Sequence, residues 1–134
     1  KGGLIGKLVT DVPGSSRYYL GGVVAYDNVV KTGLLGVPVA LLEEFGAVSE
    51  PVAGAMARRV RELLGADWAL GATGIAGPDG GTLEKPVGVV YVSLSGPRGE
   101  RVRELRLGDA PREWVRLRTS YVALDQLRRG LSGE

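Results

Sequence analysis

SEPVAGAMARRVRELLGADWALGATGIAGPDGG, residues 49–81, decides the fold, because it predicts a helix, a strand and a glycine-rich loop in direct succession. A hydroxyl residue, an acid and a proline at 49–51 are a typical helix start, and apolar residues then recur at helical spacing until Gly65. The apolar run 68–72 predicts a short buried strand. A helix followed at once by a buried strand is typical of an α/β protein.

The loop after this strand, residues 72–81, combines one hydroxyl group, several backbone N–H groups and almost no side-chain bulk. Such a loop suits the close approach of a polar or anionic ligand, although an ordinary surface loop is an equal alternative. Its spacing matches neither the phosphate-binding loop of nucleotide hydrolases nor the dinucleotide fingerprint GxGxxG. The loop by itself leaves both interpretations open.

The rest of the chain predicts further helices and strands around this centre. We expect helices at residues 2–10, 28–35, 36–45 and from Pro111 onward, and strands at 18–26, 87–95 and 101–107. Asp27 or Asn28 is the expected cap of the second of these helices. In the last helix the expected inward-facing residues are Trp114, Leu117, Tyr121, Leu124 and Leu127 or Leu131.

The order of these elements predicts one α/β domain over residues 1–134. The turn at 96–99 joins the last two strands as an antiparallel hairpin. Helices alternate with the other strands, which predicts a three-layer α/β/α sandwich on a mostly parallel mixed sheet.

The composition restricts the chemistry of any site. The 134 residues contain no cysteine and no histidine, so disulfides, thiolate zinc sites and Ser–His or Cys–His couples within the chain are excluded. The absence of cysteine agrees with a cytoplasmic protein. The net charge of +2 is only a weak indication of nucleic-acid binding. The sequence contains no apolar run of about 18 residues, so it predicts no membrane span.

Three residues at the ends of expected strands, or just after them, could share a ligand crevice. Lys31 lies in the first turn of a short helix, where the helix dipole lowers a lysine pKa towards the range of a general base. Tyr26 and Thr73 stand at strand ends, where α/β sheets bind their ligands. Taken singly, each has a structural alternative: an exposed lysine, a half-buried aromatic and a β-branched strand residue.

Several motifs, in order along the chain, resemble the CinA C-terminal domain family. They are Gly2-Gly3-Leu4-Ile5, Val12-Pro13-Gly14-Ser15-Ser16, Gly21-Gly22-Val23-Val24-Ala25-Tyr26, Lys31 with Leu34-Leu35-Gly36-Val37, Gly46-Ala47-Val48-Ser49-Glu50, Thr73-Gly74-Ile75-Ala76-Gly77-Pro78 and Lys85-Pro86-Val87-Gly88. The resemblance extends from the first residues to about Leu127.

This resemblance implies an α/β/α fold, a homodimer, no metal or cofactor, and nicotinamide-nucleotide amidase activity. The substrate would be nicotinamide mononucleotide (NMN), whose carboxamide is hydrolysed to nicotinic acid mononucleotide and ammonia by a serine–lysine mechanism. Lys31 would be the base, and Tyr26 and Thr73 its hydroxyl partners. The substrate-binding residues would be Gly2, Gly3, Gly74, Ala76, Gly77 and Arg116, with Arg112 and Arg118 as alternatives to Arg116 for the phosphate.

The chain departs from the family pattern at its first residue. Family members carry a strand ending in Glu-Ser-X-Thr-Gly-Gly, in which the serine is the nucleophile. Lys1 stands at the threonine position, so we expect this serine and the first strand to lie outside the given chain.

Two alternatives to the amidase remain open. One is a non-catalytic pyridine-nucleotide-binding or regulatory module of a larger protein, since the family often joins this domain to an N-terminal pyrophosphatase-like domain. The other is a nucleic-acid-associated protein, which the near-neutral net charge disfavours.

Overall fold

The computed structural model describes all 134 residues, Lys1–Glu134. The elements in chain order are α1 (Leu4–Thr10), the short 3₁₀ helix η1 (Ser15–Arg17), α2 (Asn28–Gly33), α3 (Val39–Phe45), α4 (Glu50–Leu64), β1 (Ala69–Gly74), β2 (Val89–Gly96), β3 (Gly99–Arg106) and α5 (Arg112–Leu131). None of the helices is both long and apolar enough to cross a membrane.

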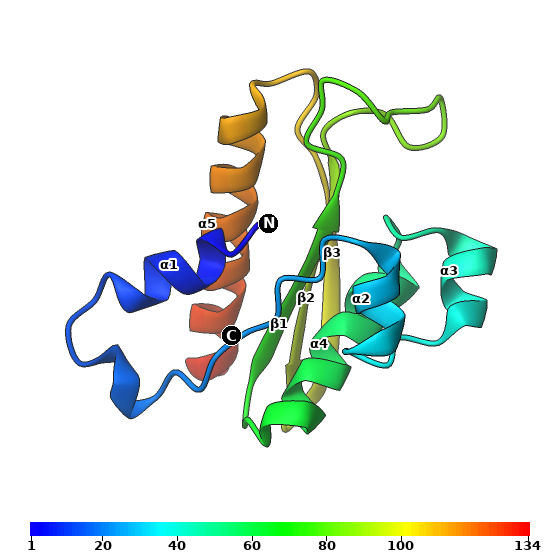
Figure 1. Cartoon of the computed structure of the whole chain (residues 1–134). Helices are drawn as coiled ribbons and strands as arrows, with labels where there is room; N and C mark the ends of the chain where they lie inside the picture. The colour runs from blue at the N-terminus through cyan, green and yellow to red at the C-terminus, as the bar shows by residue number, and fades with distance from the viewer.

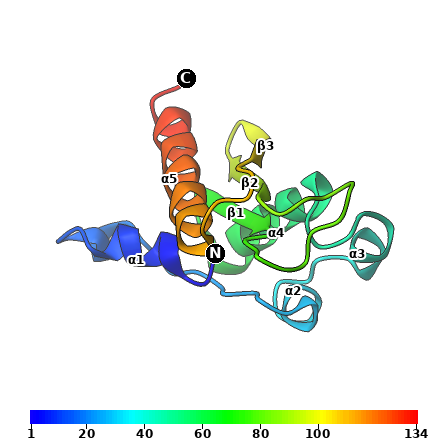
Figure 2. The ribbon, with the colours of Figure 1, turned by 90° about the horizontal axis from the view of Figure 1, so that it is seen from above.

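The strands form one sheet in the order β1-β2-β3, covered on both faces by helices. Helix α5 lies on one face with α1 across its outer side, and α4 lies on the other face with α2 and α3 beyond it (Figures 1 and 2). This arrangement confirms the α/β fold, its three layers and the β2–β3 hairpin, in which Gly96 pairs with Gly99.

The expectation of a mostly parallel sheet is wrong for the strands that the structure describes. Both pairs, β1 with β2 and β2 with β3, are antiparallel. Parallel neighbours need a crossover connection that returns the chain to the starting edge, usually through a helix. Residues 75–88, which join β1 to β2, contain no helix and turn the chain straight back.

The expected strand at residues 18–26 is also absent. Most of this segment is assigned no regular structure, and its apolar side chains at Tyr18, Leu20, Val24 and Tyr26 are exposed. A strand requires a ladder partner, and no described strand pairs with this segment. Its β-forming composition is therefore not sufficient to make it a strand in this structure.

Capping residues fix the ends of the helices that hold the site. The Asp27 side chain accepts a hydrogen bond from Val29 N at 2.8 Å and starts α2. The Ser49 hydroxyl caps α4, which ends at Gly65 in the left-handed conformation (φ 63°). These three ends agree with the sequence, because caps depend on residues only a few positions apart.

Helix α4 packs very closely on β1. A Cβ atom at Gly71 would lie 2.8 Å from Ala53 O and 3.0 Å from Ala57 N, both backbone atoms of α4. Only glycine leaves room for this approach. The contact brings the N-terminal half of α4 against the middle of β1, close to the strand end that carries Thr73.

Helix α5 buries a different stripe from the one that its large apolar residues predict. Its buried residues include Val115, Thr119, Val122 and Ala123, whereas Trp114, Leu117, Tyr121 and Leu131 are exposed. Small residues face the sheet because Val90, Val92 and Leu105 already fill that side of the core. The four exposed residues therefore form an outward stripe, and the expected orientation is wrong for them, whereas Leu124 and Leu127 are half-buried.

Candidate functional site

Lys31 is a buried lysine on α2, only 6 % exposed. Its Nζ donates to Ala25 O at 2.8 Å and to Tyr26 O at 3.3 Å. Burial lowers the pKa of this amine, and the negative charge of Asp27 partly opposes that shift. From the sequence, the helix dipole is the expected cause of a lowered Lys31 pKa. Lys31 instead lies in the last turn of this short helix, so desolvation is the cause.

A second lysine lies within electrostatic range of Lys31. The side-chain amine of Lys1 has its pKa lowered to about 8, first by burial and then by the positive charges of Arg112, Arg116 and Lys31. Its Nζ is 2.7 Å from the point where a Cβ of Gly74 would stand. A side chain at position 74 would therefore collide with this amine. We call Lys1, Lys31, Arg112 and Arg116 the cationic cluster.

Two arginines from the start of α5 complete the cationic cluster. Arg116 Nη2 donates to Lys1 O at 3.4 Å, and its guanidinium lies against Gly2. Arg112 donates through Nη1 to Gly77 O at 2.9 Å. Arg118, the third candidate, is exposed. Of the three arginines, Arg112 and Arg116 lie beside the glycine loop and the N-terminal glycines.

Tyr26 reaches the cationic cluster through its hydroxyl group. The phenol oxygen lies 3.4 Å from Arg112 Nη2, although the residue as a whole is 79 % exposed. Arg112 therefore connects three segments that are far apart in sequence: the start of α5, the glycine loop and the segment before α2. From the sequence, Arg112 is only an alternative to Arg116, and its position four residues before Arg116 is the signal for a larger role.

Thr73 is buried and points to the opposite face of the sheet from Gly74. Its Oγ1 donates to Ala47 O at 2.8 Å, in the segment that joins α3 to α4. Successive side chains of a strand face opposite sides, so Gly74 faces Lys1 and Val90 while Thr73 faces the α4 side. No hydrogen bond joins Thr73 directly to Lys31 or Tyr26.

Two of the predicted substrate-binding residues contribute little side-chain surface. The Ala76 side chain belongs to the hydrophobic core with Val90, Val92 and Val115. Gly3 lies against Val24, with its left-handed backbone (φ 87°) at the start of α1. Any contact from these positions would be made by the backbone N–H group.

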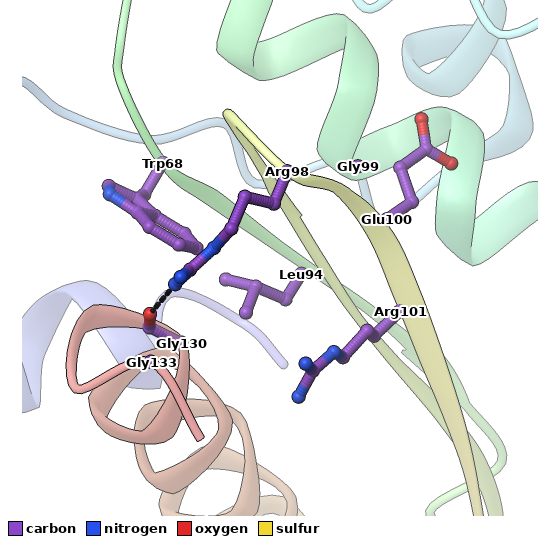
Figure 3. A pocket seen from close by; sticks show the side chains of 8 residues that line it. All are labelled: Trp68, Leu94, Arg98, Gly99, Glu100, Arg101, Gly130 and Gly133. Carbon is purple, nitrogen blue, oxygen red and sulfur yellow. Dashed lines mark hydrogen bonds between the residues drawn. The ribbon is translucent and has the colours of Figure 1, made fainter.

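A separate hollow lies at the other end of the sheet, near the β2–β3 turn and the end of α5 (Figure 3). Its volume is about 160 Å³, and Trp68, Leu94, Arg98 and Gly130 are among the residues that line it. Arg98 Nη2 donates to Gly130 O at 2.7 Å, so this guanidinium already binds a carbonyl at the end of the helix. None of the predicted catalytic or substrate-binding residues lines the hollow.

Comparison with known proteins shows the family to which the chain belongs. The family model described as CinA C-terminal domain matches residues 1–131. The chain is 56 % identical over 131 residues to a CinA-like protein of Geotalea uraniireducens, covering 97 % of this chain and 31 % of that protein. It is 54 % identical over 132 residues to a CinA-like protein of Synechocystis, covering 97 % of this chain and 32 % of the relative. The chain thus spans about a third of the length of these relatives.

Solved structures share the fold closely. The competence/damage inducible protein CihA from Agrobacterium tumefaciens superposes with a TM-score of 0.92 at 42 % identity, covering 94 % of this chain and 77 % of that chain. A competence or damage-inducible protein from Enterobacter asburiae gives a TM-score of 0.91 at 26 % identity, covering 97 % and 81 %. The cationic cluster therefore lies within a fold that these proteins share.

Proposed function

Because the chain belongs to the CinA C-terminal domain family, we propose that it is the nicotinamide-nucleotide amidase part of a larger protein. In this proposal it hydrolyses the carboxamide of NMN to nicotinic acid mononucleotide and ammonia. The observation that carries the proposal is the buried Lys31 amine, whose pKa is lowered and which shares a cationic cluster with Lys1, Arg112 and Arg116. A neutral amine next to fixed positive charge suits both proton transfer and the binding of an anionic substrate.

The first chemical step uses Lys31 as the base. Its neutral amine takes the proton of a serine hydroxyl supplied from outside the given chain, and the serine oxygen attacks the carboxamide carbon. The resulting oxyanion requires N–H donors. Ile75 N already donates to Val89 O, so the candidates are the N–H groups of Gly2, Gly3, Ala76 and Gly77.

The second step separates the products. The C–N bond breaks, the Lys31 ammonium returns its proton to the leaving nitrogen, and ammonia departs. Water then hydrolyses the serine ester, which releases the carboxylate product and restores the hydroxyl group. Arg116, with Arg112 next to it, is the proposed partner of the substrate phosphate, because a guanidinium binds two phosphate oxygens at once.

Replacing Lys31 tests this assignment in the full-length protein. Lys31→Ala is expected to reduce kcat for ammonia release from NMN by orders of magnitude, since no other buried amine donates to the Ala25 and Tyr26 carbonyls. Lys7→Ala is the matched control, because Lys7 is exposed and pairs only with Asp11. Near-normal ammonia release by a folded Lys31→Ala protein would contradict the proposed mechanism.

The second candidate function is a pyridine-nucleotide-binding module without catalysis. The cationic cluster also supports this candidate, because binding requires only the positive charges. Calorimetry with NMN, run beside the ammonia assay, separates the two functions. Binding without ammonia release from the full-length protein would favour the module.

The resemblance also implies a homodimer, a cytoplasmic location and an additional N-terminal domain. The outward stripe of α5, formed by Trp114, Leu117, Tyr121 and Leu131, supports the homodimer as an exposed apolar surface. The greater length of the CinA-like relatives supports the further domain.

A further inference from the structure

The last residue of α3 and the two residues that follow it, Phe45 to Ala47, carry three consecutive backbone carbonyl groups that each accept a hydrogen bond from a side chain. We call this segment the α3–α4 linker. The pairs are Lys85 Nζ with Phe45 O, Ser49 Oγ with Gly46 O at 2.8 Å, and Thr73 Oγ1 with Ala47 O at 2.8 Å. The three donors come from the β1–β2 loop, the N-cap of α4 and β1. The linker is therefore held from three directions.

Lys85 is the cationic member of this group. Helix α3 has no basic residue in its last turn, so the partial negative charge of its terminal carbonyls has no local partner. Lys85 supplies that partner from 40 positions away along the chain. Its own turn is closed by Thr82, whose N–H donates to Lys85 O at 2.8 Å. Figure 1 shows the β1–β2 loop reaching outward on the α3 side of the molecule.

The linker determines what Thr73 can offer to a ligand. A threonine hydroxyl has one proton, and here that proton is donated to Ala47 O. The oxygen can then only accept hydrogen bonds. A carboxamide N–H is a donor and suits such an oxygen, whereas a carboxylate has no proton to donate.

We propose that Lys85 is a positioning residue for Thr73. Lys85 binds the Phe45 carbonyl and thereby fixes the α3–α4 linker. The Ala47 carbonyl then keeps the Thr73 oxygen as a hydrogen-bond acceptor, which favours an amide ligand over the corresponding acid. The ligand part of this proposal rests on the proposed function. The part that concerns Lys85 and the linker is independent of the proposed function, because it depends only on the hydrogen bond from Lys85 Nζ to Phe45 O.

Amide hydrogen exchange tests, without any substrate, whether Lys85 holds the α3–α4 linker. In the full-length protein, Lys85→Met is expected to speed amide exchange in peptides covering residues 41–48 by several-fold, and Lys85→Arg is expected to restore most of the protection because it keeps a cationic donor. Lys7→Met removes the same charge from an exposed helix position and is the matched control. Unchanged exchange at the linker in Lys85→Met would overturn the proposal.

Ligand selectivity tests the step from the linker to Thr73. The measurement is the ratio of the Kd for nicotinic acid mononucleotide to the Kd for NMN. Lys85→Met and Thr73→Val are both expected to lower this ratio by about fivefold, the usual net effect of one neutral hydrogen bond. Lys85→Arg and Lys7→Met are expected to leave it near the original value.

The outcomes separate this proposal from the proposed function. Faster exchange at the linker with an unchanged Kd ratio would overturn the positioning role while leaving amidase activity intact. Failure of the unmodified protein to bind either nucleotide would overturn the proposed function and the ligand part together. The exchange data would still decide whether Lys85 holds the linker.

Discussion

At the scale of single residues, burial and neighbouring charge set the chemistry of the cationic cluster. Lys31 and Lys1 are both amines with a lowered pKa, and desolvation is the first cause for each. The guanidinium groups of Arg112 and Arg116 contribute further to the shift at Lys1. The mutual repulsion of these positive charges lowers the stability of the free protein, and a bound anion would relieve it.

The pH dependence of catalysis follows from the lowered pKa of Lys31. The neutral amine is the active form of the base, so kcat/KM is expected to rise with pH and to level off below the ordinary lysine pKa of 10.5. Lys31→Arg should not restore the activity, because a guanidinium does not lose its proton in this range. The measurement is a pH profile of ammonia release between about pH 6 and pH 10. A limb that rises only near 10.5 would contradict the assignment.

The same shift predicts a change in stability that is independent of substrate. The unfolded chain binds the Lys31 proton more tightly than the native protein, so the free energy of unfolding rises with pH from the lowered pKa up to 10.5. Lys31→Met should flatten that rise relative to the unmodified protein in urea unfolding at several pH values. An identical pH dependence in both proteins would show that the native amine keeps an ordinary pKa.

At the scale of elements, the close approach of α4 to β1 determines the shape of the α4 side of the sheet. Gly71 allows α4 to touch the strand, and the buried Ser93 on β2 donates to Ala53 O at 2.5 Å. These contacts place the N-cap residue Ser49 and the linker within reach of Thr73. The position of the linker is therefore a consequence of how tightly the helix packs on the sheet.

Two glycine substitutions test this packing. Gly71→Ala is expected to destabilise the protein by about 1–3 kcal/mol, since its Cβ would meet α4 backbone atoms that cannot move separately. Gly33→Ala, in α2, has no atom within 4 Å of its Cβ and is expected to be neutral or to stabilise by roughly 0.5 kcal/mol. Urea unfolding of both variants measures the difference. Equal stabilities would contradict the described contact between α4 and β1.

At the scale of the whole molecule, the surface of α5 has two apolar faces. One packs on the sheet through small residues, and the other exposes Trp114 and Tyr121. The face of α5 that packs on the sheet is buried, and its opposite face still exposes apolar side chains to solvent. A second copy of the chain is the partner that we propose for that surface.

Sedimentation velocity tests this homodimer. The unmodified protein is expected to sediment as two copies, and Trp114→Glu should shift it towards one, because a buried carboxylate opposes association. Leu83→Glu is the matched control, as Leu83 is fully exposed in the β1–β2 loop. A single-copy mass for the unmodified protein would refute the homodimer. A dimer that Trp114→Glu leaves intact would place the interface elsewhere.

The sequence by itself determined the features that depend on near neighbours. Asp27, Ser49 and Gly65 mark helix ends in both the pattern and the structure, and the turn at 96–99 forms the hairpin. Caps and tight turns are made by hydrogen bonds within a few residues, so their signals are local. The family resemblance was equally visible, because its motifs are short and occur in order.

Only the tertiary structure decided the direction of β1, the buried face of α5 and the membership of the cationic cluster. Each depends on partners far apart in the chain: β1 pairs with β2 across a 14-residue loop, and Arg112 meets Tyr26 across 86 positions. Large apolar residues predicted the wrong face of α5 because the space that remained against the sheet admitted only small side chains. Hydrophobicity shows which residues favour burial, and the packing of the assembled layers decides which of them are buried.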